Sequence, residues 1–221
     1  MNNLRKIFRG RVHYIPVLKI LSSFNRDIKV LEAGAQDEVL KELLPKNISY
    51  KTIDMYGNPD YKIDLNSQKI PAKDNSFDVL VCLETLEHTL YPKKILEEFK
   101  RVTKKDGLLI LSMPNEYNFW LRFLYLFAIK PALTDEPFEI VTKFQHIQKP
   151  RVKDDLKLFS DYFKILKVRY IWQSRLGNIS DFFYSFDRFI NFLAQFFPTI
   201  FARQVMVVAK NRKDDSTQKN K

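Results

Sequence analysis

Residues 77–88 read Phe-Asp-Val-Leu-Val-Cys-Leu-Glu-Thr-Leu-Glu-His, and residues 107–115 read Gly-Leu-Leu-Ile-Leu-Ser-Met-Pro-Asn. The apolar runs inside them, 79–83 and 108–113, are typical of strands that are buried on both faces of a parallel sheet. Residues 91–103, between the two runs, place apolar side chains at helical spacing. This stretch therefore predicts a strand, a crossover helix and a second strand parallel to the first.

Polar side chains lie just beyond the predicted ends of these two strands. Glu84, Glu87 and His88 follow the first strand, and Asn115 follows the second. Open α/β sheets bind their ligands at the carboxyl ends of their strands. We therefore expect these four residues to lie at the functional edge of the sheet. We also expect Gly107 to end the connecting helix.

The same kind of patterning extends along the rest of the chain. Further strands are predicted at residues 28–33, 50–55, 61–65, 163–172 and 205–209. Further helices are predicted at residues 35–44, 152–162 and 181–197, after a leading helical segment at 5–24 that breaks near Pro16. Strands that alternate with helices indicate an α/β fold with a doubly wound, mostly parallel, seven-stranded sheet.

The chain divides into three predicted parts. Residues 1–27 form an N-terminal helical segment, and residues 28–210 form the α/β domain. Helical insertions interrupt this domain near residues 116–148 and 176–202. Residues 211–221 are polar and charged, and we expect a disordered basic tail there.

The net charge of +11 is unevenly distributed. Residues 1–30 hold seven Lys or Arg against one acid, and residues 210–221 hold five against two, so the ends carry +9. Basic ends suit nucleic acid or an anionic membrane, but they also suit solvated Lys-rich segments, which we favour. The single cysteine, Cys82, lies in an apolar strand and has no second cysteine to pair with, which suits a reducing compartment. The sequence shows neither a secretory signal nor the run of roughly 20 apolar residues that a transmembrane helix needs. We therefore predict a cytoplasmic protein.

Five motifs occur in a characteristic order. They are Val-Leu-Glu-Ala-Gly at 30–34, Thr-Ile-Asp-Met at 52–55, Ile-Asp-Leu at 63–65, the stretch at 77–88, and Arg-Val-Thr-Lys-Lys-Asp-Gly followed by the apolar strand at 101–115. In this order and spacing, the chain resembles the class I S-adenosylmethionine-dependent methyltransferases of the type 11-like group. The resemblance is close over about residues 28–115. It implies a Rossmann-like methyltransferase fold and S-adenosylmethionine as cofactor.

The first strand-to-helix turn matches the family in part. Glu32 and Gly34 correspond to the acid and the first glycine of the family pattern, whereas Gln36 and Glu38 replace the second and third glycines. An acidic turn would repel the pyrophosphate of a dinucleotide, but it suits the positive amino and sulfonium groups of S-adenosylmethionine. The altered turn is equally consistent with a weakened or lost cofactor site.

Acids at the next strand ends complete the implied cofactor site. Asp54 corresponds to the carboxylate that binds both ribose hydroxyls in the family. The Asp64 side chain and the Leu65 backbone correspond to the groups that bind the adenine edge, and Glu84 lies at the end of the fourth strand. Each aspartate alone is also a common turn residue. Their joint placement at successive strand ends favours the cofactor site.

The Glu-x-x-Glu-His spacing leaves two chemical interpretations open. With His146 as a distant fourth residue, this spacing resembles the metal site of small-RNA 2′-O-methyltransferases. A similar cluster occurs in ubiquinone-biosynthesis O-methyltransferases. The resemblance implies a divalent cation held by Glu84, Glu87, His88 and His146. The other interpretation is metal-free, with His88 as general base and with Glu87 and His146 beside it. A purely structural role, in which Glu87 and His88 orient the next helix, also fits the spacing.

Two aromatic segments carry no such motif. Residues 119–129 are almost wholly apolar, and we expect a lid over an apolar substrate there, with a membrane-surface role as the alternative. Residues 182–197 carry an apolar stripe at helical spacing. We expect this stripe to pack on the sheet, because exposure of so many large apolar side chains is unfavourable.

The sequence thus favours an enzyme that moves a methyl group from S-adenosylmethionine to an oxygen of a small metabolite, lipid or saccharide intermediate. We expect a partly apolar acceptor, with peripheral membrane contact as an option. One alternative is an inactive member of the fold that binds a partner. Another is a nucleic-acid methyltransferase, but Met113-Pro114-Asn115 is not the Asn/Asp-Pro-Pro-aromatic motif of base methyltransferases, so nucleic acid is the weaker prediction.

Overall fold

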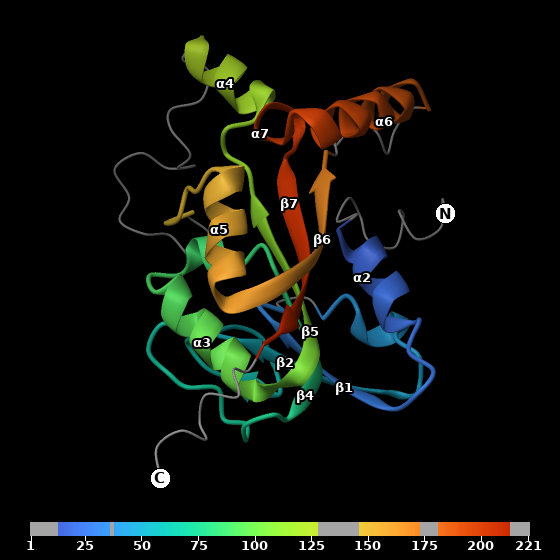
Figure 1. The fold of residues 1–221 in the computed structure, drawn as a ribbon, viewed down its shortest axis with the longest axis vertical. Helices are drawn as coiled ribbons and strands as arrows, with labels where there is room; N and C mark the ends of the chain where they lie inside the picture. The colour runs from blue at the N-terminus through green and yellow to red at the C-terminus, as the bar shows by residue number, and fades with distance from the viewer. Residues whose placement is uncertain (1–12, 36–37, 128–145, 173–180, 213–221) are drawn as a thin grey trace.

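The computed structural model describes residues 13–35, 38–127, 146–172 and 181–212. Seven strands form one sheet in the order β3-β2-β1-β4-β5-β7-β6 (Figure 1). They are β1 (Ile28–Ala33), β2 (Ile48–Asp54), β3 (Tyr61–Lys62), β4 (Phe77–Leu83), β5 (Thr103–Pro114), β6 (Phe163–Ile171) and β7 (Gln204–Asn211). The first five strands pair in parallel, and β7 runs antiparallel to both of its neighbours. The predicted fold class is therefore confirmed.

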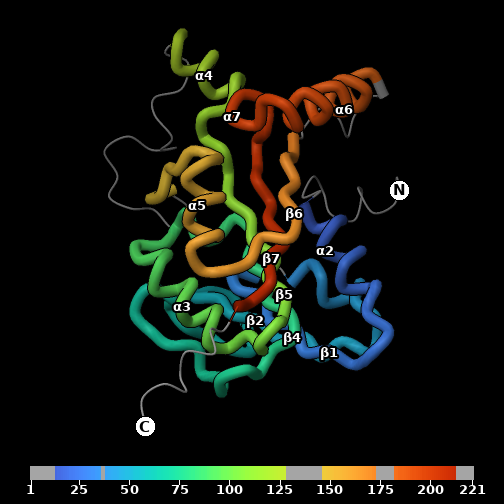
Figure 2. The backbone as a smooth tube through the Cα atoms, viewed as in Figure 1, coloured from blue at the N-terminus to red at the C-terminus, as the bar shows by residue number. Residues whose placement is uncertain are grey.

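Helices cover both faces of the sheet. They are α2 (Tyr14–Leu21), α3 (Pro92–Val102), α4 (Phe119–Leu126), α5 (Val152–Tyr162), α6 (Asp181–Phe196) and α7 (Pro198–Phe201), with short 3-10 helices η1 (Lys41–Leu43) and η2 (Leu86–His88). Figures 1 and 2 show α3 and α5 against one face and α2 against the other. One core cluster contains Phe99 of α3 and Phe159 of α5, and the other contains Leu21 of α2. Strand β4 lies between these layers and is buried along its whole length, as its continuous apolar run predicts.

The helix predicted at residues 35–44 is wrong for the part that the structure describes. Only η1 forms there, and Glu38 has a left-handed φ of 45° that does not continue a right-handed helix. The hydroxyl of Thr52 in β2 donates a hydrogen bond to Oε1 of Glu38 at 3.1 Å. In residues 38–47, therefore, no α-helix presents its N-terminal N–H groups to the carboxyl end of β1.

Gly107 does not end α3, contrary to our prediction. The helix ends at Val102, and β5 begins at the next residue. Gly107 lies within β5, where a Cβ atom would be 2.8 Å from Cγ2 of Thr103 and 2.9 Å from the carbonyl oxygen of Asp78. The glycine is thus required by close packing in the strand.

Three predicted boundaries also change. Pro16 lies in the first turn of α2, where its missing N–H needs no partner, so the helix does not break there. Strand β3 ends at Lys62, two residues before Asp64. Asn211, which the sequence assigns to the tail, is buried at the end of β7, and its side-chain amide donates to the carbonyls of Lys100 and Thr103, each at 2.9 Å.

In the part of the chain that the structure describes, no helix has both the length and the apolarity to cross a membrane.

Candidate active site

Three acids meet at the carboxyl ends of neighbouring parallel strands. Glu32 lies in β1, Asp54 is the last residue of β2, and Glu84 directly follows β4. Since β1 pairs in parallel with both β2 and β4, these strand ends lie at one edge of the sheet. Glu32 is buried and accepts a hydrogen bond from the Tyr50 hydroxyl through Oε2. Burial and the charge of Glu32 raise the pKa of Tyr50 above its ordinary value, so the phenol stays a donor.

Asp54 retains capacity for a ligand. Its side chain is half-buried, and Oδ1 accepts a hydrogen bond from the backbone N–H of Tyr56 at 2.9 Å. Oδ2 can accept a hydroxyl group. The ribose-binding role of Asp54 stays a prediction, and this geometry leaves Oδ2 open for it.

The turn after β1 is shaped by packing. Gly34 has a φ of +77°, and a Cβ atom there would lie 2.0 Å from Oγ1 of Thr85. Thr85, which follows Glu84, donates a hydrogen bond from Oγ1 to the carbonyl of Leu83 at 3.0 Å. Because Gly34 has no Cβ atom, Thr85 can pack against it. The turn after β1 and the turn after β4 therefore lie in contact and border the same site. Gln36, the position of the second family glycine, lies outside the described residues.

Asp64 and Leu65 lie in a turn after β3. Oδ1 of Asp64 accepts from the backbone N–H of Asn66 at 2.9 Å, and Oδ2 accepts from the hydroxyl of Ser67 at 3.1 Å. Asn66 Oδ1 in turn accepts from the backbone N–H of Leu90 at 2.7 Å. Both oxygens of Asp64 thus stabilise the turn, and Asn66 connects the turn to the segment after β4. The predicted contact between Asp64 and adenine stays a prediction.

Glu84 adopts a strained backbone conformation. Its φ of 50° is left-handed, which is uncommon outside glycine and concentrates at functional sites. Oε1 accepts a hydrogen bond from the Ser112 hydroxyl at 3.0 Å. Burial raises the pKa of Glu84 to about 7, although hydrogen bonds from Gln204 and Ser112 act to lower it. The carboxyl group therefore sits between β4, β5 and β7.

Glu87, His88 and His146, which the family resemblance placed in one site, lie close together next to this edge. One ligand atom from each lies within 4.8 Å of the others. Glu84 is not part of this group, so the predicted four-residue metal set reduces to three among the described residues. The rings of His88 and His146 meet edge to face with centroids 4.9 Å apart. Glu116 contacts Nδ1 of His146 and thereby orients that imidazole.

Glu87 carries a buried carboxyl group. Among the described residues, neither of its oxygens has a hydrogen-bond partner, and Oε1 lies 3.9 Å from Nε2 of His88. Burial, together with the charge of Glu84, raises the pKa of Glu87 well above its ordinary value. A buried and unpaired carboxyl group is unfavourable for stability, and such groups concentrate at functional sites.

Two hydrogen bonds from Gln148 bring the distant His146 to this place. The backbone N–H of Gln148 donates to the carbonyl of Glu87 at 2.8 Å, and its side-chain amide donates to the carbonyl of Thr89 at 2.9 Å. The segment after the insertion is thus fixed to η2.

Sequence reasoning missed Glu116 and Asp155. Asp155 is buried on the inner face of α5, and among the described residues neither of its side-chain oxygens has a partner. Burial raises the pKa of Asp155 to about 8, with additional effects from Asp154 and Glu84. An available signal was its position between Val152 and Phe159, because an acid on the apolar face of a helix is unusual. The sequence shows no comparable signal for Glu116.

Asn115 directly follows β5, as predicted, and its side chain connects parts of the fold. It is buried, and its side-chain amide donates to the carbonyls of Thr199 and Ala202 at 3.0 and 2.8 Å. Its Oδ1 accepts from the backbone N–H of Tyr117 at 3.0 Å. Asn115 therefore joins the end of β5 to α7.

Part of the sequence is similar to known proteins. Residues 36–111 match the family described as a methyltransferase domain. The chain is 32% identical over 120 residues to an uncharacterized protein of Methanocaldococcus jannaschii, which covers 54% of this chain and 45% of that protein. It is 27% identical over 106 residues to the ubiquinone biosynthesis O-methyltransferase of Colwellia psychrerythraea, covering 41% and 43%. The chain thus spans less than half the length of each of these curated relatives.

The fold has close solved counterparts. The crystal structure of a SAM-dependent methyltransferase from Archaeoglobus fulgidus superposes with a TM-score of 0.58 at 16% identity, covering 93% of this chain and 94% of that chain. The protein therefore has the fold of solved S-adenosylmethionine-dependent methyltransferases, and its residues 36–111 match the methyltransferase domain family. S-adenosylmethionine is the cofactor that this family implies.

Proposed function

We propose that the protein transfers a methyl group from S-adenosylmethionine to an oxygen atom of a partly apolar small molecule. The observation that carries this proposal is the His88–Glu87 pair, in which a half-buried imidazole lies 3.9 Å from a buried carboxyl group. The similarity to an O-methyltransferase at 27% identity supports oxygen as the acceptor atom.

The residues at the strand ends suit the cofactor. Glu32, Asp54 and Glu84 present three carboxyl groups at one sheet edge, and S-adenosylmethionine carries a positive amino group and a positive sulfonium. Asp54 would hold the ribose hydroxyls through Oδ2, and Glu32 would face the amino acid end. No phosphate has to be bound, so the loss of the helix after β1 removes no essential donor.

The proposed chemistry is a direct displacement. S-adenosylmethionine, when bound, supplies an electrophilic methyl carbon on a positively charged sulfur. His88 would take the proton of the acceptor hydroxyl as that oxygen receives the methyl group, and the sulfur would leave with the electrons of its former bond to the methyl carbon. Glu87 stabilises the imidazolium that forms, because its carboxyl group ionises more readily beside a positive charge. Glu116 holds His146 in place beside His88.

A divalent cation is a second way to use the same residues. Glu87, His88 and His146 offer ligand atoms within 4.8 Å of one another, and the contact between Glu116 and His146 resembles the carboxylate that orients a metal-binding imidazole. Such an ion would lower the pKa of the acceptor hydroxyl. Titration calorimetry with Mn²⁺, with His146→Ala as the matched variant, distinguishes the two modes. Heat that His146→Ala abolishes would favour the cation, and no heat would favour His88 as base.

One experiment tests the proposed function before any substrate is known. Calorimetry with S-adenosylmethionine should show binding at micromolar to millimolar concentration. A protein with no detectable binding at millimolar cofactor would instead be a binding protein on the methyltransferase fold. The missing helix after β1 is the observation that favours that second candidate.

A further inference from the structure

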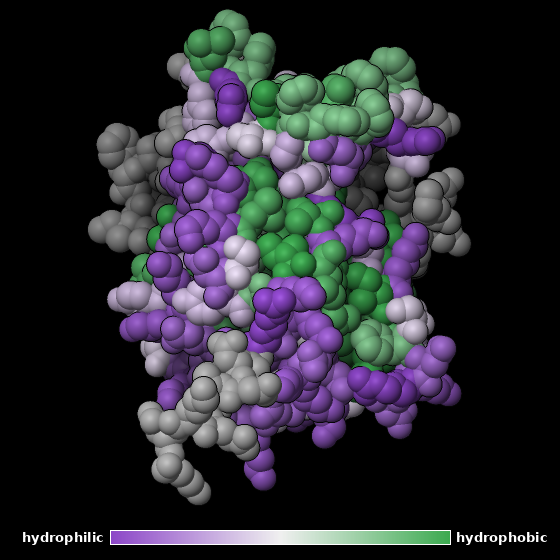
Figure 3. Space-filling view, viewed as in Figure 1, coloured by the Kyte–Doolittle hydropathy of each residue, from purple (hydrophilic) through white to green (hydrophobic). Residues whose placement is uncertain are grey.

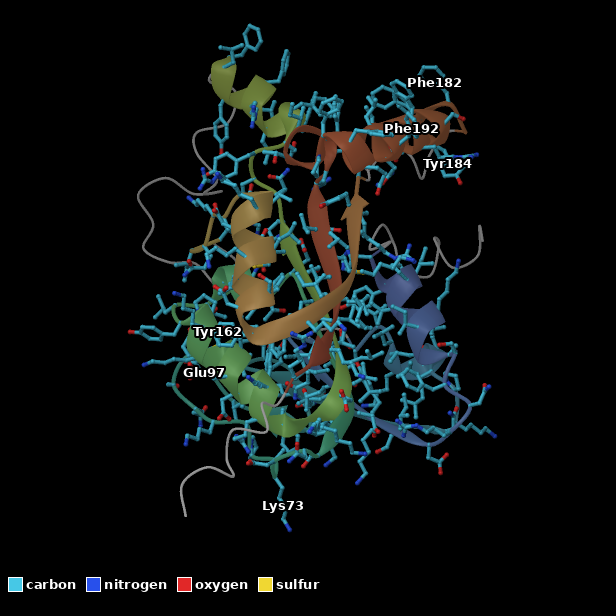
Figure 4. The ribbon with its side chains drawn as sticks, in the orientation of Figure 1. Lys73, Glu97, Tyr162, Phe182, Tyr184 and Phe192 are labelled. Atoms are coloured by element: carbon cyan, nitrogen blue, oxygen red, sulfur yellow. The ribbon has the colours of Figure 1, made fainter. Side chains whose placement is uncertain are left out.

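Helix α6 has its apolar face toward solvent. Its exposed large apolar side chains are all phenylalanines, and Phe182 and Phe196 are 74% and 63% exposed. The others are Phe186, Phe189 and Phe192. Figure 4 shows Phe182 and Phe192 projecting from α6 away from the sheet. We had expected this stripe to pack on the sheet, and that expectation is wrong.

Polar residues hold α6 in this orientation. Asp187 is buried and accepts a hydrogen bond from Nε1 of Trp172 at 3.0 Å. Asn191 accepts from the backbone N–H of Trp172 at 2.9 Å and donates to its carbonyl at 2.7 Å. Turning the phenylalanines inward would break these bonds and expose Asp187. The outward apolar face is therefore built into the structure.

Helix α4 extends the same apolar surface. Phe119 stacks on Trp172 with ring centroids 5.0 Å apart, so one tryptophan anchors both helices. Trp120, Phe123 and Leu126 are exposed, and Leu126 is 78% exposed. Figures 1 and 3 show α4, α7 and α6 together at one end of the molecule, with apolar side chains over them. Exposed apolar patches that join several elements mark interaction sites. We call the exposed side chains of α4 and α6 the aromatic surface.

The exposed charged side chains beside the aromatic surface are basic, which favours a negatively charged partner. Among the side chains of α4, α6 and α7 that the structure describes, the exposed charged ones are Arg122 and Arg188. The whole chain carries a net charge of +11. Phenylalanine and tryptophan beside arginine, on helices that lie across one end of a domain, suit the interface of an anionic bilayer.

We propose that the aromatic surface docks the protein onto an anionic lipid bilayer, with α6 and α4 lying in the plane of the interface. Helix α4 starts three residues after Glu116, which contacts His146, so docking would bring the candidate active site close to lipid. A consequence, which rests on the proposed function, is that the acceptor is a hydroxylated compound dissolved in the bilayer.

Vesicle flotation with the full chain tests the docking without cofactor or acceptor, so its result is independent of the proposed function. Vesicles of phosphatidylcholine with phosphatidylglycerol are compared with vesicles of phosphatidylcholine alone. The variant Phe182→Ser/Phe189→Ser/Phe196→Ser removes apolar side chains from the aromatic surface. The control is Leu166→Ser, because Leu166 is 50% exposed but belongs to β6 and not to the aromatic surface.

We expect the native chain and the control to bind anionic vesicles, and the triple variant to bind at least tenfold more weakly. High salt should weaken binding of the native chain, because the arginines contribute by charge. Equal binding of native chain and triple variant would overturn the proposal. So would a native chain that floats with neither vesicle type but forms a dimer that the triple variant loses, since the surface would then bind a second copy of the chain. Circular dichroism checks that each variant is folded.

Discussion

Thr85 occupies the space in which a side chain at position 34 would begin. A Cβ atom on Gly34 would lie 2.0 Å from Oγ1 and 2.7 Å from Cγ2 of Thr85, and the backbone at Gly34 has a φ of +77°. The turn after β1 and the turn after β4 are thereby fixed against each other. Because Glu32 directly precedes the first of these turns and Glu84 lies in the second, the contact helps to set the shape of the candidate active site.

We predict that Gly34→Ala destabilises the protein by about 3 kcal/mol, because it adds overpacking to an unfavourable φ. Urea unfolding followed by circular dichroism measures this loss. Gly57→Ala is the matched control, since Gly57 has a similar φ of 70° in an exposed loop. If overpacking is the cause, Gly34→Ala/Thr85→Ala should recover part of the loss. A double variant no more stable than Gly34→Ala would contradict the role of Thr85.

Asp54→Asn should weaken S-adenosylmethionine binding about tenfold to a hundredfold. The variant loses a charge-assisted hydrogen bond to a ribose hydroxyl, which contributes about 1.5–3 kcal/mol. Calorimetry gives the affinity, and thermal unfolding shows that the fold is kept. Asp27→Asn is the control, because Asp27 is exposed just before β1, at the other edge of the sheet. An unchanged affinity in Asp54→Asn would remove Asp54 from the cofactor site.

Asp155 predicts an unusual dependence of stability on pH. Its folded pKa of about 8 lies above its ordinary value of 3.8, so the folded state binds the proton more tightly than the unfolded state. Its contribution to stability is complete below pH of about 4 and is lost as the pH rises toward 8. The free energy of unfolding, measured in chelator, should therefore fall over this range by an amount on the order of a few kcal/mol.

Asp155→Asn should make that pH dependence less steep, because the amide does not titrate, whereas Glu84 and Glu87, whose pKa values are also raised, still do. Asp161→Asn, an exposed acid on the same helix, should leave the pH dependence unchanged. If native protein and Asp155→Asn lose stability in parallel between pH 5 and 8, Asp155 is not the group responsible.

Glu87→Gln should lower the activity of the protein without lowering its stability. It removes a buried carboxyl group that has no hydrogen-bond partner among the described residues, so the melting temperature at pH 8 should rise or stay constant. Methyl transfer, once an acceptor is identified, should fall about a hundredfold, because His88 loses the group that stabilises its protonated form. Glu97→Gln, at an exposed position on α3, is the control. Full activity in Glu87→Gln would falsify the catalytic role of the pair.

The sequence alone was sufficient where local pattern and burial agree. Helix α5 runs from Val152 to Tyr162 as predicted, because its apolar residues repeat at helical spacing and pack on one side of the sheet. Strand β4 was equally clear, since a continuous apolar run between turns suits a central parallel strand. The order of such elements also predicted the fold class, which the sheet order confirms.

Only the tertiary structure decided which distant residues meet. His146 reaches His88 because Gln148 bonds to the chain at Glu87 and Thr89, a contact that no local pattern contains. The tertiary structure likewise decided the direction of the phenylalanines on α6. Helical periodicity defines an apolar face but not what that face meets, and the hydrogen bonds of Asp187 and Asn191 to Trp172 turn it outward.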